Sequence, residues 1–147
     1  MNQLEIKTVT YLEAIEPLQM IRCIVFQDEQ GVNPELEFDG LDESAVHLLA
    51  YLDGEPVGTA RIRKLEPQTA KIERVAVLSS ARGFGIGTEL VKTALELISR
   101  NKNYLKVVVN AQEYIKKLYE KLGFQSVGEP FDEAGIPHIK MIKYLEG

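Results

Sequence analysis

The segment with the clearest chemical potential is Arg82-Gly83-Phe84-Gly85-Ile86-Gly87, which lies between an apolar, strand-like run and a helical pattern. Glycines let backbone N–H groups approach a ligand closely. The start of a helix adds unpaired N–H groups and the positive end of the helix dipole, which together favour phosphate. Arg82 places a cation where an anionic ligand would enter. The segment therefore predicts a turn that binds a phosphate-bearing ligand.

Two common phosphate-binding motifs do not fit this turn. A P-loop ends in Gly-Lys-Ser/Thr, whereas Gly87 is followed by Thr88 and Glu89. A dinucleotide-binding fingerprint that starts at Gly83 needs glycine or alanine at position 88, where threonine stands. A helix that merely begins with flexible glycines is the plain structural alternative. Three glycines within five residues, behind an arginine, are more than such a helix needs.

The flanking patterns predict the elements that would hold this turn. Alternating apolar residues and turn signals such as Asp53-Gly54 indicate strands at 4–9, 46–52, 57–65, 71–77, 104–110, 125–131 and 139–145. Helical spacing of apolar residues indicates helices at 17–26, 86–100 and 113–122. Thr10-x-x-Glu13 resembles a capping box, but Pro17 would then lie inside the helix, so we expect the helix to begin near Pro17. Residues 27–43 are expected to form a loop with at most a short helical turn.

The order of these elements predicts one α/β (α+β) domain over residues 1–147, with a mixed, mainly antiparallel sheet of about six to seven strands flanked by helices. A length of 147 residues fits one domain, and the chain contains no linker-like segment. The single cysteine, Cys23, cannot form an internal disulfide, and nothing indicates a metal site. The sequence shows no apolar run long enough for a membrane and no signal peptide, so we expect a cytoplasmic protein.

The charge argues against nucleic acid as a partner. The net charge is −5, whereas nucleic-acid affinity comes largely from Lys and Arg that neutralise phosphates. From Gln27 to Ala60 there is no Lys or Arg, while nine Asp and Glu residues fall in that stretch. This acidic stretch is either a solvated loop or a rim that attracts a cationic substrate such as an amine.

Several motifs together resemble the GNAT superfamily of acetyl-CoA-dependent N-acetyltransferases. Arg82-x-x-Gly85-x-Gly87, after Val75-Ala76-Val77, is similar to the family's Q/R-x-x-G-x-G/A signature. Asn110, followed by the run Leu118–Phe124, resembles its later strand, helix and Gly-aromatic motif. The Ile21-Arg22 region and the run Gly135–Met141 are similar to a small bacterial branch, the ElaA/YjcF-like group. The resemblance covers nearly the whole chain.

The resemblance implies a three-layer GNAT fold and direct transfer of an acetyl group from acetyl-CoA to a primary amine, without a metal. The pyrophosphate of CoA would be held by Arg82, Gly83, Phe84, Gly85, Ile86, Gly87 and Thr88. The strand before the glycines would part from its neighbour at Asn110, which would bind pantetheine or a bridging water there or simply end its strand. Backbone groups of Val75 and Val77 would hold the pantetheine arm, and a backbone N–H near Ala76 or Val77 would polarise the thioester. The acceptor would be a small molecule or a protein lysine, and GNAT relatives are often homodimers. The alternative is an acyl-CoA-binding or sensing domain with little turnover.

Two side chains are the candidates for catalysis. Tyr119 occupies the family's tyrosine position, and since free tyrosine has a pKa of about 10 it can protonate the leaving thiolate. The alternative for Tyr119 is a core or rim tyrosine. Glu73 is the candidate general base, because strand alternation places it on one face with Val75 and Val77. The alternative for Glu73 is an ion pair with Arg61 or Arg63.

The remaining polar candidates are expected to be structural. Arg61 and Arg63 share a strand face and either pair with the acidic stretch or contact a substrate carboxylate. His47 and His138 are expected to be satisfied structural histidines. Cys23 lies beside the apolar helix face and is expected to act as a small buried hydrophobe.

Overall fold

The computed structural model describes residues 3–145. Its strands are β1 (Leu4–Val9), β2 (Val46–Leu52), β3 (Glu55–Glu66), β4 (Thr69–Val77), β5 (Lys106–Gln112), β6 (Gln125–Glu133) and β7 (Ile136–Tyr144). Its helices are α1 (Ile15–Arg22), α2 (Pro34–Glu37), α3 (Ile86–Ser99) and α4 (Lys116–Lys121). Three further helical turns are the π-helical η1 (Cys23–Glu29) and the 3-10 turns η2 (Ser79–Ala81) and η3 (Glu113–Ile115).

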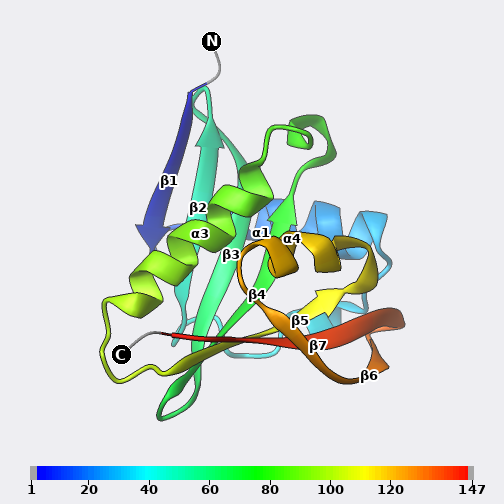
Figure 1. The fold of residues 1–147 in the computed structure, drawn as a ribbon. Helices are drawn as coiled ribbons and strands as arrows, with labels where there is room; N and C mark the ends of the chain where they lie inside the picture. Colours follow the sequence, from blue (N-terminus) through cyan, green and yellow to red (C-terminus); the bar gives the residue numbers. More distant parts are fainter. Residues whose placement is uncertain (1–2, 146–147) are drawn as a thin grey trace.

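The seven strands form one mixed sheet in the order β1-β2-β3-β4-β5-β7-β6. Only the β4–β5 pair is parallel among the strand pairs of the described residues. α3 crosses the near face of the sheet in Figure 1, and α1 lies behind it. The expected layered domain with a mixed, mainly antiparallel sheet is therefore confirmed.

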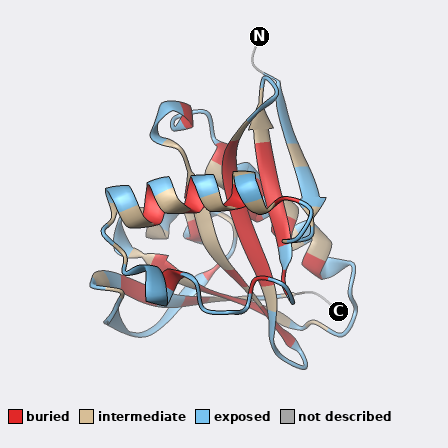
Figure 2. Ribbon diagram, turned by 180° about the vertical axis from the view of Figure 1, so that it is seen from behind, coloured by how far each residue is buried: buried red, intermediate tan, exposed pale blue. Residues whose placement is uncertain are grey.

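Alternation along β2 divides the core between the two faces of the sheet. Leu49 packs with Leu18, Ile21 and Val25 of the first helical layer. Leu48 belongs to the larger cluster that includes the buried stripe of α3. Figure 2 shows the buried central strands, whereas β6 is exposed along its whole length. No helix in residues 3–145 is long and apolar enough to cross a membrane.

The bounds of β1 and β2 are those expected, whereas the first helix differs. Thr10 and Glu13 do exchange capping-box hydrogen bonds, at 2.7 and 3.3 Å, but they do so in a turn that precedes the helix. α1 begins at Ile15, so Pro17 lies in its first turn, where a proline's missing N–H costs no helical bond. The helix then continues as η1 to Glu29, three residues beyond the expected end. The expected loop therefore begins later, and it contains the short helix α2.

The later elements differ from expectation mainly at their ends. β3, β4 and β6 are longer than expected, and β7 begins three residues earlier. β5 is shifted by two residues, because it begins at Lys106 instead of Tyr104. α3 begins at Ile86 as expected. Gly58 allows α3 to lie close to the sheet, since a Cβ at this residue would be 3.1 Å from Leu90 Cδ1 and 3.2 Å from the Ala76 carbonyl oxygen.

β4 and β5 part after a short parallel pairing. They pair only at Thr69, Ala70 and Lys71 of β4, which face Lys106, Val107 and Val108 of β5. Beyond these positions β5 continues beside β7 while β4 stays beside β3. The strands therefore diverge two residues before Asn110, and the β5-facing backbone of the second half of β4 has no strand partner.

A β-bulge at Arg74 changes the face of the sheet on which the following side chains of β4 lie. Arg74 has a φ of 55°, and the register passes from the pair Arg61–Glu73 to the pair Thr59–Ala76. Three residues of β4 thus span two of β3, which is the mark of a bulge. Opposed residues share a face, so Glu73 lies on the face of Ala76 and not on that of Val75 and Val77. The expectation that Glu73 shares a face with those valines was therefore wrong.

Candidate active site

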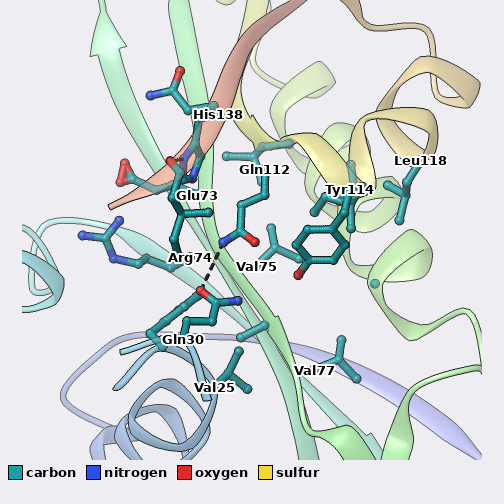
Figure 3. A pocket seen from close by; sticks show the side chains of 18 of the residues that line it. Val25, Gln30, Glu73, Arg74, Val75, Val77, Gln112, Tyr114, Leu118 and His138 are labelled. Carbon is teal, nitrogen blue, oxygen red and sulfur yellow. Dashed lines mark hydrogen bonds between the residues drawn. The ribbon is translucent and has the colours of Figure 1, made fainter. Parts of the chain in front are cut away.

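The divergence of β4 and β5 opens a cavity of about 660 Å³. The cavity joins both faces of the sheet, since Val25 and Gln30 line it from the α1–η1 side and Leu118 lines it from the α4 side (Figure 3). It is also lined by the candidate residues Glu73, Val75, Ala76, Val77, Arg82, Gly83, Gly85, Ile86, Gly87, Thr88, Asn110 and Tyr119. Phe84 is the exception, because its side chain is exposed and does not line the cavity.

The glycine turn presents backbone donors at one end of the cavity. Gly85 is the N-cap of α3, with a left-handed φ of 74° and no side-chain cap. The first N–H groups of an α-helix have no partner within the helix, so those of Ile86, Gly87 and Thr88 are available to a ligand. A Cβ built on Gly85 has no atom within 4 Å, so the space beside it is open. This end of the cavity has the geometry of an anion site at the N-terminus of α3, a helix of 14 residues.

Arg82 is held beside this turn by two contacts. Its Nε donates to the carbonyl oxygen of Val77 at 3.0 Å, and its Nη2 lies 2.9 Å from Glu29 Oε1. The side chain remains 47% exposed. Arg82 is therefore a cation at the cavity entrance that a ligand phosphate can reach by displacing a surface carboxylate.

Tyr119 lies at the α4 wall of the cavity. Its ring packs edge-to-face against Phe124, with centroids 5.5 Å apart. Burial raises the pKa of Tyr119 above its usual value, and the nearby Tyr114 acts in the same direction. The hydroxyl is therefore protonated at neutral pH, as a proton donor to a leaving thiolate must be.

Comparison with known proteins decides the family. The sequence pattern described as the acetyltransferase (GNAT) domain matches residues 22–145. The chain belongs to the GNAT acetyltransferase family. It is 36% identical to the protein ElaA of Escherichia coli (strain K12) over 132 residues, and the match covers 86% of this chain and 84% of that protein. It is 35% identical to the uncharacterized N-acetyltransferase YjcF of Bacillus subtilis (strain 168) over 132 residues, 89% of this chain and 93% of that one.

Solved structures agree with this assignment. The crystal structure of Escherichia coli ElaA matches with a TM-score of 0.85 and 30% identity, over 96% of this chain and 99% of that chain. A GNAT family acetyltransferase from Elizabethkingia anophelis, solved with acetyl-CoA bound, matches with a TM-score of 0.73 and 25% identity, over 97% of this chain and 98% of that chain. The resemblance to the ElaA/YjcF-like branch is confirmed.

In this GNAT protein, Glu73 is an ion-pair partner. Its carboxylate accepts a hydrogen bond from Arg61 and lies 2.9 Å from Arg63 Nη2. Burial alone would raise the pKa of Glu73, but the charges of Arg61, Lys71 and Arg63 outweigh it and lower that pKa. A carboxylate held in this way binds a proton weakly. The structure thus shows the alternative that the sequence left open for Glu73.

The acidic stretch of the acetyltransferase is only partly a solvated loop, because three of its carboxylates pair with buried arginines. Buried Arg22 lies 2.6 Å from Asp42 and 2.8 Å from Glu37. Arg61, also fully buried, pairs with Asp42 at 3.0 Å and with Asp39 at 2.7 Å. Several of its carboxylates thus neutralise buried arginines, which weakens the case for an acidic rim. Sequence analysis missed the burial of Arg22, because a single arginine on an amphipathic helix carries no sign of it.

Arg63 and Arg74 complete this network on the cavity side. Arg63 pairs with Glu73 of the neighbouring strand and not with the acidic stretch. Arg74 donates to the carbonyl oxygens of Leu36 and Glu37, each at 3.2 Å. The strained backbone at Arg74 is thus accompanied by contacts that link the bulge to the segment around α2.

The other polar candidates lie in different surroundings. Asn110 Nδ2 donates to Glu133 Oε1 at 3.3 Å. His47 is fully buried and its Nε2 lies 2.9 Å from the Asp42 carbonyl oxygen, but its buried Nδ1 has no hydrogen-bond partner, so the ring is structural without being fully satisfied. Cys23 is half-buried instead of buried, because it lies where α1 gives way to the π-helical turn. In residues 3–145 no group of three or more His, Cys, Asp or Glu side chains is placed to hold a metal ion.

Proposed function

We propose that this GNAT acetyltransferase transfers an acetyl group from acetyl-CoA directly to a primary amine in the cavity between β4 and β5. The observation that carries the proposal is the parting of these strands, which leaves the inner edge of β4 unpaired beside the glycine turn. A strand edge of this kind binds an extended ligand by main-chain hydrogen bonds. The pantetheine arm of CoA is an extended chain with amide donors and acceptors.

The cofactor would lie along three parts of the cavity. Its pyrophosphate would accept hydrogen bonds from the backbone of Gly83–Thr88, with Arg82 neutralising charge. Its pantetheine arm would pair with the backbone of Val75 and Val77, while Asn110 contacts the arm from β5. The thioester carbonyl would then accept a hydrogen bond from a β4 N–H near Ala76 or Val77 and develop negative charge there during transfer.

The chemical step requires a proton donor for the thiolate. Tyr119 lines the cavity and keeps its proton at neutral pH because burial raises its pKa. After the amine attacks, the C–S bond breaks and Tyr119 gives its proton to the CoA thiolate. Glu73 is less suited to activating the amine, because its pKa is lowered by ion pairs. We assign Glu73 to holding Arg63 in the wall of the cavity and to pairing with buried Arg61 behind it.

The acceptor class is a primary amine on a small molecule or on a lysine side chain. The acceptor end of the cavity combines apolar side chains such as Val25 and Phe26 with polar ones such as Gln112. Because several carboxylates of the acidic stretch pair with arginines, a multiply charged cation is not favoured over an ordinary alkylamine.

Thiol release from acetyl-CoA, measured across a panel of primary amines, tests the proposal. The proposal predicts amine-dependent release together with an acetylated amine detected by mass spectrometry. CoA binding without release for any amine would contradict it and favour an acyl-CoA-sensing domain. A matched reaction without protein corrects for spontaneous acetylation.

A further inference from the structure

His138 lies at the acceptor side of the cavity and was expected to be only structural. It lies on β7 opposite Gln112 of β5 and lines the cavity with Glu73 and Arg74 (Figure 3). Its ring is stacked on Phe131 of β6, with centroids 6.1 Å apart. The side chain is 8% exposed, so its position is set by packing.

One hydrogen bond fixes the tautomer of His138. Its Nδ1 lies 2.7 Å from the carbonyl oxygen of Ile136. A carbonyl oxygen only accepts hydrogen bonds, so Nδ1 must carry the proton in this contact. The neutral ring then has its lone pair on Nε2. His138 therefore presents a proton acceptor at Nε2 beside the cavity.

A carboxylate lies next to that acceptor. Glu133 Oε2 is 3.5 Å from His138 Nε2, while Glu133 Oε1 accepts a hydrogen bond from Asn110. A carboxylate only accepts hydrogen bonds, so Glu133 can bond Nε2 once that nitrogen has taken up a proton. The triad of Asn110, Glu133 and His138 thus joins β5, β6 and β7 at the point where β4 has moved away.

We propose that His138 is the general base of the acetyl transfer, with Glu133, whose carboxylate lies 3.5 Å from Nε2, as a positioning residue. This proposal rests on the proposed function. Acceptor amines are mainly ammonium ions at neutral pH and must lose a proton before they attack. Histidine is suited to this task because it changes charge between about pH 5 and 8.

The proton balance of the step is complete without any further reactant. The acceptor ammonium gives one proton to His138 Nε2, and the neutral amine attacks the thioester carbon. The C–N bond forms, the C–S bond breaks, and Tyr119 protonates the departing thiolate. The second amine proton restores Tyr119, and His138 releases its proton to solvent. The net products are an amide, CoA thiol and one proton.

The other titratable groups around the cavity are less suited to this role. Glu73 is paired with arginines, and Glu37 is paired with buried Arg22. Lys71 and Arg63 also line the cavity, but their ammonium and guanidinium groups only donate hydrogen bonds and have no lone pair to accept a proton. The second histidine, His47, does not line the cavity. Among the described residues, His138 is the cavity histidine with an imidazole nitrogen left as an acceptor by its hydrogen bonding.

The tautomer gives a test that needs no acceptor. The chain has two histidines, so a long-range ¹H–¹⁵N NMR spectrum of the whole protein resolves both rings, and the His138→Gln variant assigns them by loss. The proposal expects the neutral His138 ring to be protonated at Nδ1 and unprotonated at Nε2. A neutral ring protonated at Nε2 would overturn it, whatever the enzyme's activity.

Kinetics give the second test, with the best alkylamine of the panel as acceptor. At pH 7, His138→Gln should lower kcat/KM for the amine by about 100-fold or more while the KM for acetyl-CoA stays unchanged. The loss should shrink as the pH rises, because the amine then loses its proton unaided. With a weakly basic amine that is already neutral at pH 7, the variant should match the wild type within about threefold.

Two outcomes of the kinetic test separate the possibilities. A loss of equal size at every pH and for both amines would overturn the base and make His138 structural. If no amine of the panel makes the wild type release thiol, the proposed function fails, and the tautomer measurement still decides whether Nε2 can accept a proton.

Glu133→Gln should lower kcat/KM for the amine about two- to fivefold, because the Glu133–His138 pair is partly exposed. Glu129→Gln, at an exposed residue of the same strand, should leave kcat/KM unchanged.

Discussion

The guanidinium of Arg82 lies 2.9 Å from the carboxylate of Glu29, joining the cofactor turn to the end of η1. A phosphate that binds Arg82 must compete with this carboxylate. Partly exposed ion pairs contribute about 0–1 kcal/mol, which corresponds to at most about fivefold in a binding constant. If Arg82 binds a phosphate of CoA as proposed, the pair should reduce the affinity for CoA slightly.

Glu29→Gln should accordingly tighten CoA binding by about two- to fivefold, as measured by isothermal titration calorimetry. Asp28→Asn, which changes the charge of the preceding residue of η1, serves as the control for the general field of the acidic stretch. Equal changes in both variants would show that the Arg82–Glu29 contact itself has no effect.

Gly85→Val should abolish measurable CoA binding. The left-handed φ of 74° disfavours a β-branched residue, and the new side chain would fill open space beside the free N–H groups. Gly54→Val is a matched control, because Gly54 has a φ of 85° and lies in the β2–β3 turn away from the cavity. Both variants should lose about 1–3 kcal/mol of unfolding free energy. Only Gly85→Val should lose CoA binding, and an unchanged affinity would remove the phosphate turn from the account.

Tyr119→Phe should lower kcat by about 100-fold or more, with a smaller effect on acetyl-CoA binding. The packing against Phe124 is retained in this variant, so the fold should be unaffected. Tyr144→Phe, at an exposed tyrosine of β7, is the matched control for loss of a hydroxyl. A wild-type rate for Tyr119→Phe would exclude this residue as the proton donor.

Arg61→Leu should destabilise the protein by about 3–5 kcal/mol, because it leaves buried carboxylates without their partner. Arg61 is fully buried and pairs with Asp39, Asp42 and Glu73. Urea unfolding at neutral pH measures the loss. A loss of unfolding free energy below about 1 kcal/mol would show that these ion pairs stabilise the fold no more than an apolar side chain does at the same position.

The same network predicts how stability varies with pH. Burial opposes ionisation of Asp42 and Glu73, but their arginine partners outweigh it and lower both pKa values. A carboxylate with a lowered pKa in the folded state stabilises that state above the unfolded pKa of about 4, and the contribution is lost as the pH falls further. Unfolding free energy should therefore fall steeply below about pH 4 in the wild type and less steeply in Arg61→Leu. Parallel curves for the two proteins would contradict this.

His47 should add a shallower decline at higher pH. Its burial lowers its pKa, so the folded state favours the neutral ring. That contribution is complete above the unfolded pKa of about 6.5 and is lost as the pH falls below it. Unfolding curves from pH 7 to 5 measure this decline, which should be absent from His47→Gln.

The glycine turn was predictable because its physics is local. A strand, three glycines, an arginine and an amphipathic helix follow one another in the sequence, and α3 begins at Ile86 as expected. The bulge at Arg74 was not predictable in this way. Nothing in the letters around Arg74 demands a positive φ, and the bulge follows from the contacts of β4 with β3 and the α2 region.

This one irregularity explains the wrong face assigned to Glu73, since alternation holds only in an unbroken strand. The base candidate at His138 was undervalued for a related reason. Its chemistry depends on a carbonyl two residues away and on a carboxylate from a neighbouring strand. The spacing of residues along the chain does not reveal either contact. The ion pairs of Arg22 were missed because they join α1 to residues 15 and 20 positions later.

A crystal structure with acetyl-CoA bound would show directly where the cofactor lies. We expect the pyrophosphate on the backbone N–H groups of Gly83–Thr88, the pantetheine arm paired with Val75 and Val77, and the thioester between Tyr119 and His138. Acetyl-CoA bound outside the space between β4 and β5, or with its thioester away from both side chains, would contradict this expectation.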